Sequence, residues 1–192
     1  MKKLFILMLI ALVSYQAKAQ LVVVKYPGYT SYWHSIVKIP DSVVYVVKPH
    51  AKAVDREADF HATGGRTNIN RDYDNSGYDK GHLCDASDEN GNKTDEYNSF
   101  DQVNIFPQKP HLNRVTWLAL ENYVRVLAKK YGSVRVRVSY HGICGVLQPD
   151  RVAIPCYCDK EIWYGTSGHE KYSMPNADTV SNHLFTFYKV KP

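Results

Sequence analysis

The heptapeptide Gly77-Tyr78-Asp79-Lys80-Gly81-His82-Leu83 places a histidine directly after the second of two glycines, and the rest of the chain is organised around it. Glycine has no Cβ, so the backbone there can bend or approach a ligand closely. An imidazole has an ordinary pKa of about 6.5 and is largely neutral, hence basic, near pH 7. His82 is therefore a candidate general base, and the preceding turn signal at residues 75–77 indicates that it lies in a loop.

The clearest helix follows about thirty residues downstream, over roughly residues 114–130. Apolar residues recur there at intervals of three and four, Asn113 can cap the start, and Lys129-Lys130 suits the end. Glu121 and Arg125 lie one turn apart on this helix. That spacing is typical of a helix-surface ion pair worth about 0.3–0.5 kcal/mol, and it also suits two groups that support a catalytic site.

Several short segments have the composition of strands. Residues 134–140 alternate valine with arginine and serine, which predicts a strand with one buried and one basic face. Because strands dominate around one long helix, without strict alternation of strand and helix, the sequence predicts an α+β fold with a mainly antiparallel sheet. The other expected strands are residues 21–24, 43–47, 152–155 and 183–188.

The connections between these elements contain further candidate residues. Residues 51–74 show no sustained period and contain Arg56, which is either a solvated loop charge or part of a site. The polar, acidic residues 86–98 are expected at the surface. Asn104 lies in the apolar segment 103–108, where a polar side chain needs a partner. It either satisfies backbone groups in a turn or orients a site.

The first nineteen residues have the pattern of a secretory signal peptide: Lys2-Lys3, an apolar run over residues 4–13, and Ala17-Lys18-Ala19. The apolar run is too short to span a membrane, which takes about 20 residues. We therefore expect cleavage before Gln20, a single exported domain over residues 20–192, and no membrane association afterwards. Loss of three lysines would leave 21 basic against 19 acidic residues, so the net charge would fall from +5 to +2.

Four cysteines remain in the exported domain, and an oxidising compartment permits disulfides. Cys156 and Cys158 are separated by a single residue, and a disulfide between two cysteines so close in a strand is awkward. We expect Cys144 to pair with one of them. No Cys-x-x-Cys or matching histidine spacing supports a zinc site instead.

The order of the candidate segments resembles the DNA/RNA non-specific endonuclease family of ββα-metal nucleases. The resemblance extends over roughly residues 43–188, with Arg56 and Phe60 fitting its upstream part. It implies a ββα-metal core within the antiparallel fold and one long helix in the active site. The segments that carry it are Asp79-Lys80-Gly81-His82-Leu83, Asn104-Ile105-Phe106-Pro107-Gln108, Asn113, and Trp117 through Glu121 to Arg125.

The resemblance implies that His82 is the general base and that Asn113 binds the metal. An amide oxygen is a hard, neutral ligand suited to Mg²⁺, with Mn²⁺ as a substitute. A helical rise of about 1.5 Å per residue puts the Cα of Glu121 about 12 Å from that of Asn113 along the axis, and that of Arg125 about 18 Å. Glu121 is therefore expected to hold a metal-bound water, and Arg125 to clamp a phosphate.

The remaining family positions complete the expected site. Arg56 would stabilise transition-state charge together with Arg125, and both would bind substrate. Asn104 is grouped with the catalytic residues. Lys80 stands where the family motif usually has arginine and would bind substrate, although without the planar five-donor fork of a guanidinium. Cys84-Asp85 replaces the Ala-Pro pair often found after the His-Leu of the motif, and it places an extra thiol and carboxylate near the base.

The leading hypothesis is a secreted or periplasmic, Mg²⁺-dependent endonuclease, monomeric or homodimeric. It would hydrolyse DNA and RNA with little sequence specificity, because contacts to phosphates position a substrate without reading its bases. The resemblance implies products with 5′-phosphate ends. The main alternative is a nucleic-acid-binding protein of the same fold with impaired catalysis. An exported structural or interaction module would leave the motif order unexplained.

Overall fold

The computed structural model describes residues 21–49, 59–88 and 93–192. Two predictions, the signal peptide at residues 1–19 and the role of Arg56, lie outside these residues. Within the described part of the chain, no helix is both long and apolar enough to cross a membrane.

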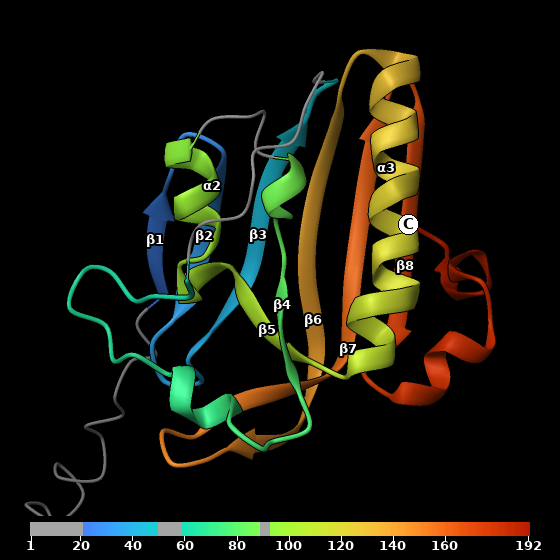
Figure 1. Cartoon of the computed structure of the whole chain (residues 1–192). Helices are drawn as coiled ribbons and strands as arrows, with labels where there is room; N and C mark the ends of the chain where they lie inside the picture. Colours follow the sequence, from blue (N-terminus) through green and yellow to red (C-terminus); the bar gives the residue numbers. More distant parts are fainter. Residues whose placement is uncertain (1–20, 50–58, 89–92) are drawn as a thin grey trace, which may run out of the picture.

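A seven-stranded sheet forms the body of the molecule (Figure 1). Its strand order is β1-β2-β3-β6-β7-β8-β9, and every neighbouring pair is antiparallel. The structure thus confirms the α+β class with a mainly antiparallel sheet. The strands are β1 (Leu21–Lys25), β2 (Tyr29–His34), β3 (Ile39–Val47), β6 (Val134–Leu147), β7 (Val152–Tyr164), β8 (Gly168–Pro175) and β9 (Lys189–Val190).

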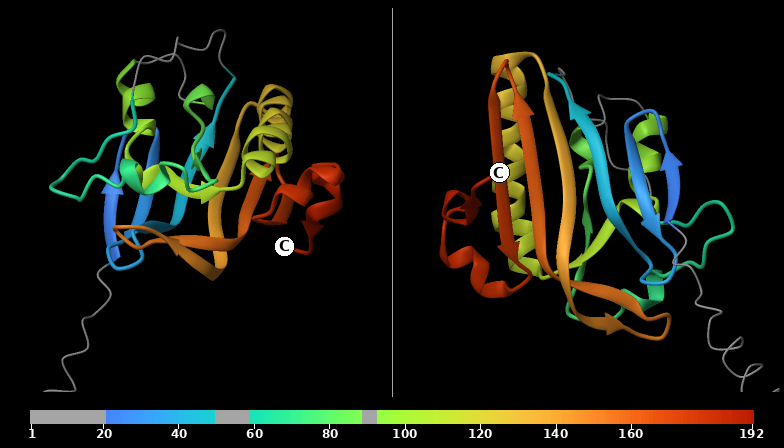
Figure 2. Two further views of the ribbon diagram at one scale, coloured as in Figure 1. Left: turned by 60° about the horizontal axis from the view of Figure 1, so that its bottom comes forward. Right: turned by 180° about the vertical axis from the view of Figure 1, so that it is seen from behind.

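One face of this sheet carries the remaining elements. Figure 1 shows α3 (Leu118–Tyr131) lying over it beside the small sheet of β4 (Asp79–His82) and β5 (Ile105–Gln108), with α2 (Lys93–Ser99) beyond β5. The view from behind shows the strands in front of these elements (Figure 2). The alternation predicted for β6 is observed: Val136 and its alternate neighbours are fully buried, whereas Arg135 and Arg137 are exposed.

The expected loop around His82 is a strand, so that prediction was wrong. β4 (Asp79–His82) pairs antiparallel with β5 (Ile105–Gln108), and His82 lies opposite Ile105. The hydrogen-bonding partner is more than twenty residues downstream, which local turn signals cannot reveal. Gly81 is required by packing, because a Cβ there would lie 1.9 Å from Oε1 of the buried Gln108.

The long helix begins earlier than predicted. A π-helical turn, Leu112–Trp117, leads into α3, so Asn113 lies inside the first turn and does not cap it. Its backbone N–H donates to the carbonyl of Lys109 at 2.9 Å. The predicted end is confirmed by Gly132, which adopts φ 84° at the C-terminal cap.

Two further expectations were wrong. Residues 183–188 contain the 3₁₀ helix Phe185–Tyr188 in place of a strand, and the hydroxyl of Tyr188 donates to the carbonyl of Val180 at 2.9 Å. The acidic stretch is not simply surface, because Asp88 and Glu96 are buried. The remaining short helices are Asn70–Tyr73, Ala86–Asp88, Gln102–Asn104 and Asp178–Asn182.

A disulfide joins Cys144 of β6 to Cys156 of β7, as one of the two predicted pairings. Cys158, two residues on, faces the core and is fully buried. Burial raises the pKa of its thiol to about 12, so it is protonated at neutral pH. Cys84, the departure beside the motif, is also a fully buried thiol.

Candidate active site

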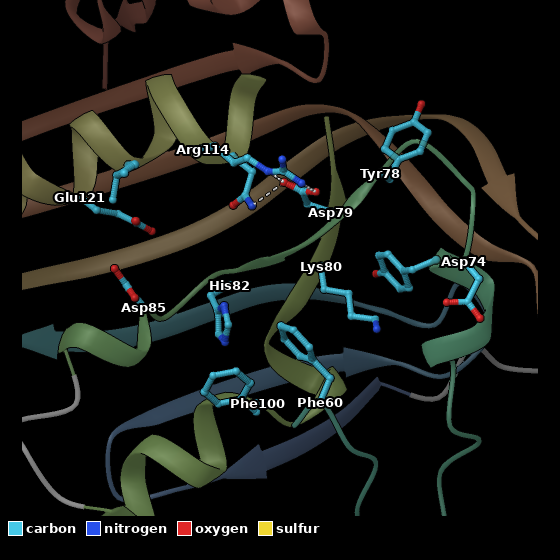
Figure 3. A pocket seen from close by; sticks show the side chains of 13 residues that line it. Phe60, Asp74, Tyr78, Asp79, Lys80, His82, Asp85, Phe100, Arg114 and Glu121 are labelled. Atoms are coloured by element: carbon cyan, nitrogen blue, oxygen red, sulfur yellow. Dashed lines mark hydrogen bonds and ion pairs between the residues drawn. The ribbon is translucent and has the colours of Figure 1, made fainter. Parts of the chain in front are cut away.

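The imidazole of His82 is held between two phenylalanine rings. The centroid of Phe60 lies 5.1 Å from it and that of Phe100 lies 4.7 Å from it, the latter edge-on at 85°. Strand pairing fixes the backbone of His82, and the two rings restrict its side chain. The histidine therefore stands at a defined orientation on a cavity wall (Figure 3).

Four of the predicted site residues line one cavity of 630 Å³. Lys80 and His82 come from the same face of β4, Asn113 from the π-helical turn, and Glu121 from α3. A volume of this size is within the range of small-molecule sites and leaves room for a phosphodiester with its water. Tertiary structure thus brings together residues that are about forty positions apart in the sequence.

Asn113 is oriented by a carboxylate from the neighbouring strand. Its Nδ2 donates to Oδ2 of Asp79 at 3.0 Å. The same carboxylate accepts two bonds from Arg114, from Nε at 2.8 Å and from Nη2 at 2.6 Å. Because the amide nitrogen of Asn113 is used by Asp79, its carbonyl oxygen is the end that remains for a cation.

Asp79 carries its negative charge through this arrangement. Partial burial by itself would raise the pKa of its carboxyl group. The hydrogen bonds from Arg114 and Asn113, with the charge of Arg114, outweigh burial and lower the pKa below its usual value. Asp79 is therefore ionised at neutral pH, as orientation of the Asn113 amide requires.

Glu121 is a buried carboxylate, 6% exposed, at the inner end of the cavity. Its Oε1 accepts a bond from Nζ of Lys160 at 3.4 Å, so the simple helix-surface pair with Arg125 was the wrong interpretation. Burial raises the pKa of Glu121, Lys160 opposes this, and Asp85 adds to it. Figure 3 shows the carboxylates of Glu121 and Asp85 on the same side of the cavity as His82.

Arg125 does not line the cavity, contrary to a direct role as a phosphate clamp in this conformation. Its Nη1 donates to Asp85 and to Asp88, each at 3.0 Å, and Nη2 donates to Asn122. Its hydrogen bond to Asp85 links Arg125 to the cavity, because Asp85 lines it. Asp85, which stands where the sequence motif often has proline, thus pairs with the guanidinium of Arg125.

Asn104 also lies outside the cavity lining. Its side chain is fully buried and bonds only to backbone groups: Oδ1 accepts from the N–H of Cys84, and Nδ2 donates to the carbonyls of Cys84 and Ser99, all at 2.8 Å. These contacts match the first of the two readings that the sequence left open, in which Asn104 satisfies backbone groups in a turn. A catalytic role for Asn104 stays a prediction.

Lys80 extends away from Glu121 and Asp85, towards the end of the cavity where Phe60 and Asp74 lie (Figure 3). Its Nζ lies 5.2 Å from the ring centre of Phe60 and 5.5 Å from that of Tyr73. Burial lowers the pKa of Lys80, while the charges of Asp74 and Asp59 oppose the shift. The ammonium is thus held over two rings, where a phosphate entering the cavity would meet it.

Sequence reasoning missed three charged residues of the site: Asp79 as a brace, Arg114 and Lys160. Nothing in the sequence pattern indicated a site role for Arg114, since an arginine near the start of a helix is common. The position of Lys160 in the sequence did indicate something unusual. It shares a strand phase with the apolar residues Cys158 and Ile162, so alternation would have placed a lysine on the buried face of β7.

The donors available for a metal are oxygens: the amide of Asn113 and the carboxylates of Glu121 and Asp85. Among the described residues, no three His, Cys, Asp or Glu side chains converge as a ready cation site. Such a donor set suits Mg²⁺, which keeps several waters and takes few protein ligands. It suits zinc poorly, because zinc prefers nitrogen and sulfur ligands.

Comparison with known proteins places these residues in a wider group. The family model described as DNA/RNA non-specific endonuclease matches residues 13–191. The chain is 33% identical over 144 residues to mitochondrial endonuclease G of Homo sapiens, covering 64% of this chain and 48% of that protein. It is 32% identical over 83 residues to a nuclease of Nostoc sp., covering 43% and 30%. The chain thus spans less than half the length of these relatives.

A solved structure shares the fold. A chain in the crystal structure of the EndoG/EndoGI complex, described as showing the mechanism of EndoG inhibition, superposes with a TM-score of 0.79 at 26% identity. The match covers 88% of this chain and 80% of that chain. It therefore includes both the large sheet and the layer that carries the cavity.

Proposed function

The chain belongs to the DNA/RNA non-specific endonuclease family, and from that premise we propose that it is a metal-dependent endonuclease that hydrolyses phosphodiester bonds. The observation that supports this most directly is the convergence of His82, Asn113 and Glu121 on one cavity. A general base, a hard oxygen ligand and a buried carboxylate are the groups that a metal-assisted hydrolysis needs.

His82 acts as the general base in the proposed reaction. It takes a proton from the attacking water as the water oxygen bonds to phosphorus. The bond to the 3′ oxygen breaks, and that oxygen leaves with the bonding electron pair and takes a proton from a neighbouring water. The product then keeps its phosphate on the 5′ end. Contacts with Phe60 and Phe100 hold the imidazole on the cavity wall, so the proton acceptor is in place before the substrate enters.

Asn113 would hold a Mg²⁺ ion through its carbonyl oxygen, and Glu121 would hold it through a water molecule. The brace from Asp79 supports this assignment, because it turns the amide oxygen of Asn113 away from the carboxylate. A bound Mg²⁺ supplies positive charge that offsets the negative charge building on the phosphoryl oxygens. Mn²⁺ has similar ligand preferences and is expected to substitute.

Lys80 and Arg114 are the cationic side chains of the cavity lining and would bind the substrate phosphates. Arg114 uses Nε and Nη2 on Asp79, and its side chain is 68% exposed at the mouth of the cavity. Arg56 and Arg125 are proposed to add charge stabilisation in the transition state. For Arg125, substrate binding would have to draw the guanidinium from Asp85 or act through that carboxylate.

We propose that the substrates are both DNA and RNA and that the protein is exported. Contacts to phosphates carry no base information, which favours weak sequence preference. Export is supported by the signal-like residues 1–19 and by the disulfide between Cys144 and Cys156, since such bonds persist in oxidising compartments.

The test is to incubate the protein with plasmid DNA and with RNA, in Mg²⁺, in Mn²⁺ and in EDTA. We expect metal-dependent cutting that falls by about 10²- to 10⁴-fold in His82→Ala, the usual contribution of a general base. His169→Ala is the matched control, because this exposed histidine of β8 is outside the cavity lining. Products that can be ligated without prior kinase treatment would carry 5′-phosphates.

Two results would contradict the proposal. Cutting that survives in His82→Ala would remove His82 as the base. Nucleic acid that is shifted in a gel but never cut, with any of the metals, would favour the impaired binding protein of the same fold. The binding assay is run at low salt, because phosphate contacts weaken as salt rises.

A further inference from the structure

Lys160 is a charged residue in the interior of the molecule. Its side chain is fully buried in the middle of β7, on the same face as Ile162. Taking an ammonium group out of water costs several kcal/mol unless it is paired in good geometry. A lysine in this place therefore needs compensating partners, and those partners indicate what it does.

Both partners of Lys160 belong to the helix that carries the site. Its Nζ donates to Oε1 of Glu121 at 3.4 Å. The same atom lies 4.3 Å from the ring centre of Trp117, which is 1% exposed. The sheet thus places the ammonium group of Lys160 against the buried face of α3, beside Glu121, which lines the cavity.

Glu121 faces charges from two segments besides its own helix. Asp85 and Asp88, from the segment after β4, disfavour its ionised form, as does burial. Lys160 and Arg125 favour the ionised form, and Lys160 has the larger influence of the two.

We propose that Lys160 is a positioning residue for phosphodiester hydrolysis, because its buried ammonium contacts the carboxyl group of Glu121 and holds it in place at the cavity wall. The inference rests on the proposed function and adds a residue to it. Lys160 touches neither substrate nor metal and acts only through Glu121. Without it, Glu121 would face two aspartates with Arg125 as its remaining cation.

The competing reading is that Lys160 and Glu121 form an ordinary buried ion pair that contributes to folding alone. Buried pairs often add little net stability, because desolvation offsets their attraction. A stability measurement by itself cannot separate the two readings. The test must measure properties that folding alone would not change: the pH profile and the response to Mg²⁺.

The experiment compares Lys160→Met, Glu121→Gln and the double variant with the wild-type protein, in cutting assays over a range of pH and Mg²⁺ concentration. We expect Lys160→Met to lower activity at pH 7 by about 10- to 100-fold and to raise the half-saturating Mg²⁺ concentration. We expect the acid limb of the pH profile to move upward, because the cation that favours the charged form of Glu121 is removed.

The double variant tests whether Lys160 acts through Glu121. If it does, the double variant is no less active than Glu121→Gln alone, and its pH profile matches that variant. Lys38→Met is the control for loss of a lysine ion pair, because Lys38 pairs with Asp150 outside the cavity lining. Should the Met variant not fold, Lys160→Gln replaces it, with the same expected shift of the acid limb.

Three outcomes would overturn the inference. Unchanged cutting and an unchanged acid limb in Lys160→Met would assign the pair to folding alone. Losses that multiply in the double variant would show that Lys160 acts independently of Glu121. If the wild-type protein itself cuts nothing, the proposed function fails, and the role of Lys160 in it falls with it; the wild-type assay reveals this before any variant is compared.

Discussion

Single residues around the cavity differ in how their charge is stabilised, and the two cases have opposite pH dependence. Asp79 is braced by Arg114 and Asn113, which hold its pKa below the ordinary value in spite of partial burial. Asp88 lies deeper, where burial and the neighbouring Asp85 raise its pKa to about 6 although Arg125 opposes the shift. Ionisation of Asp79 therefore stabilises the folded protein, whereas ionisation of the more deeply buried Asp88 destabilises it.

Asp79→Asn is expected to destabilise the protein at pH 7 and to have little effect in strong acid. A carboxyl group with a lowered folded-state pKa stabilises the fold above its unfolded pKa, and that contribution is lost as pH falls through the folded value. Urea unfolding at pH 7 and near pH 2 measures the difference, with Glu161→Gln as a control for loss of a surface pair to His169. An equal loss of stability at both pH values would contradict the assignment.

Asp88→Asn should show the reverse trend. A group with a raised folded-state pKa stabilises the fold below its unfolded pKa, and this is lost as pH rises through about 6. A shift from 3.8 to about 6 corresponds to about 3 kcal/mol. The unfolding free energy of the variant relative to wild type should therefore rise by about that amount between pH 4 and 7. Asp178→Asn, at an exposed position, should show no such trend.

At the scale of elements, the β4–β5 pair decides where the base stands. Lys80 and His82 are two positions apart in β4, so their side chains share a face of the strand. Gly81, between them, packs closely against the side chain of Gln108. The π-helical turn then brings Asn113 within reach of Asp79 at the start of β4. Two short strands and one irregular turn thus assemble residues that the long helix alone could not.

Gly81→Ala is expected to destabilise the protein by about 1–3 kcal/mol, the usual effect of forcing extra volume into a packed interior. The added Cβ would lie 1.9 Å from Oε1 of Gln108. Thermal or urea unfolding measures the loss, and Gln108→Ala in the same chain should restore part of it by removing the clashing atoms. Gly145→Ala is the control, because its Cβ would make an ordinary 3.4 Å contact. Comparable losses at both glycines would argue against the specific clash.

On the scale of the whole molecule, the net charge is too small to attract nucleic acid by itself. The formal charge of the full chain is +5, and it would be +2 after removal of the signal-like segment. Attraction for nucleic acid must therefore come from cations at the cavity, such as Lys80 and Arg114. Few phosphate contacts imply a shallow dependence of binding on salt.

Binding of the His82→Ala variant to a single-stranded oligonucleotide tests this. Each phosphate contact changes the slope of log K against log salt by about 0.7 for a single strand. Adding Lys80→Gln should reduce the slope by about that amount and weaken binding to different sequences alike. Lys171→Gln, outside the cavity lining on β8, is the control. A slope unchanged by Lys80→Gln would exclude this lysine from the phosphate contacts.

Much of the architecture was readable from local pattern. The alternation around Val136 predicted a strand with a buried and a basic face, and apolar spacing predicted the long helix to its end near Gly132. These succeed because side-chain periodicity reports directly on which face of an element is buried. The expected strand at residues 183–188 failed because its aromatic residues pack in a 3₁₀ turn, which composition does not distinguish from a strand.

The sequence by itself determined the order of the motif residues, the fold class and the family, since each is carried by residue type and spacing along the chain. Only the tertiary structure decided the partners of the charges. Arg125 pairs with Asp85 across 40 positions, and Glu121 pairs with Lys160 across 39. The physical reason is that burial and electrostatic pairing depend on distance in space, which no local pattern encodes. For the same reason, the segment of His82 that was expected to be a loop is a strand, since its pairing with residues 105–108 depends on the tertiary structure.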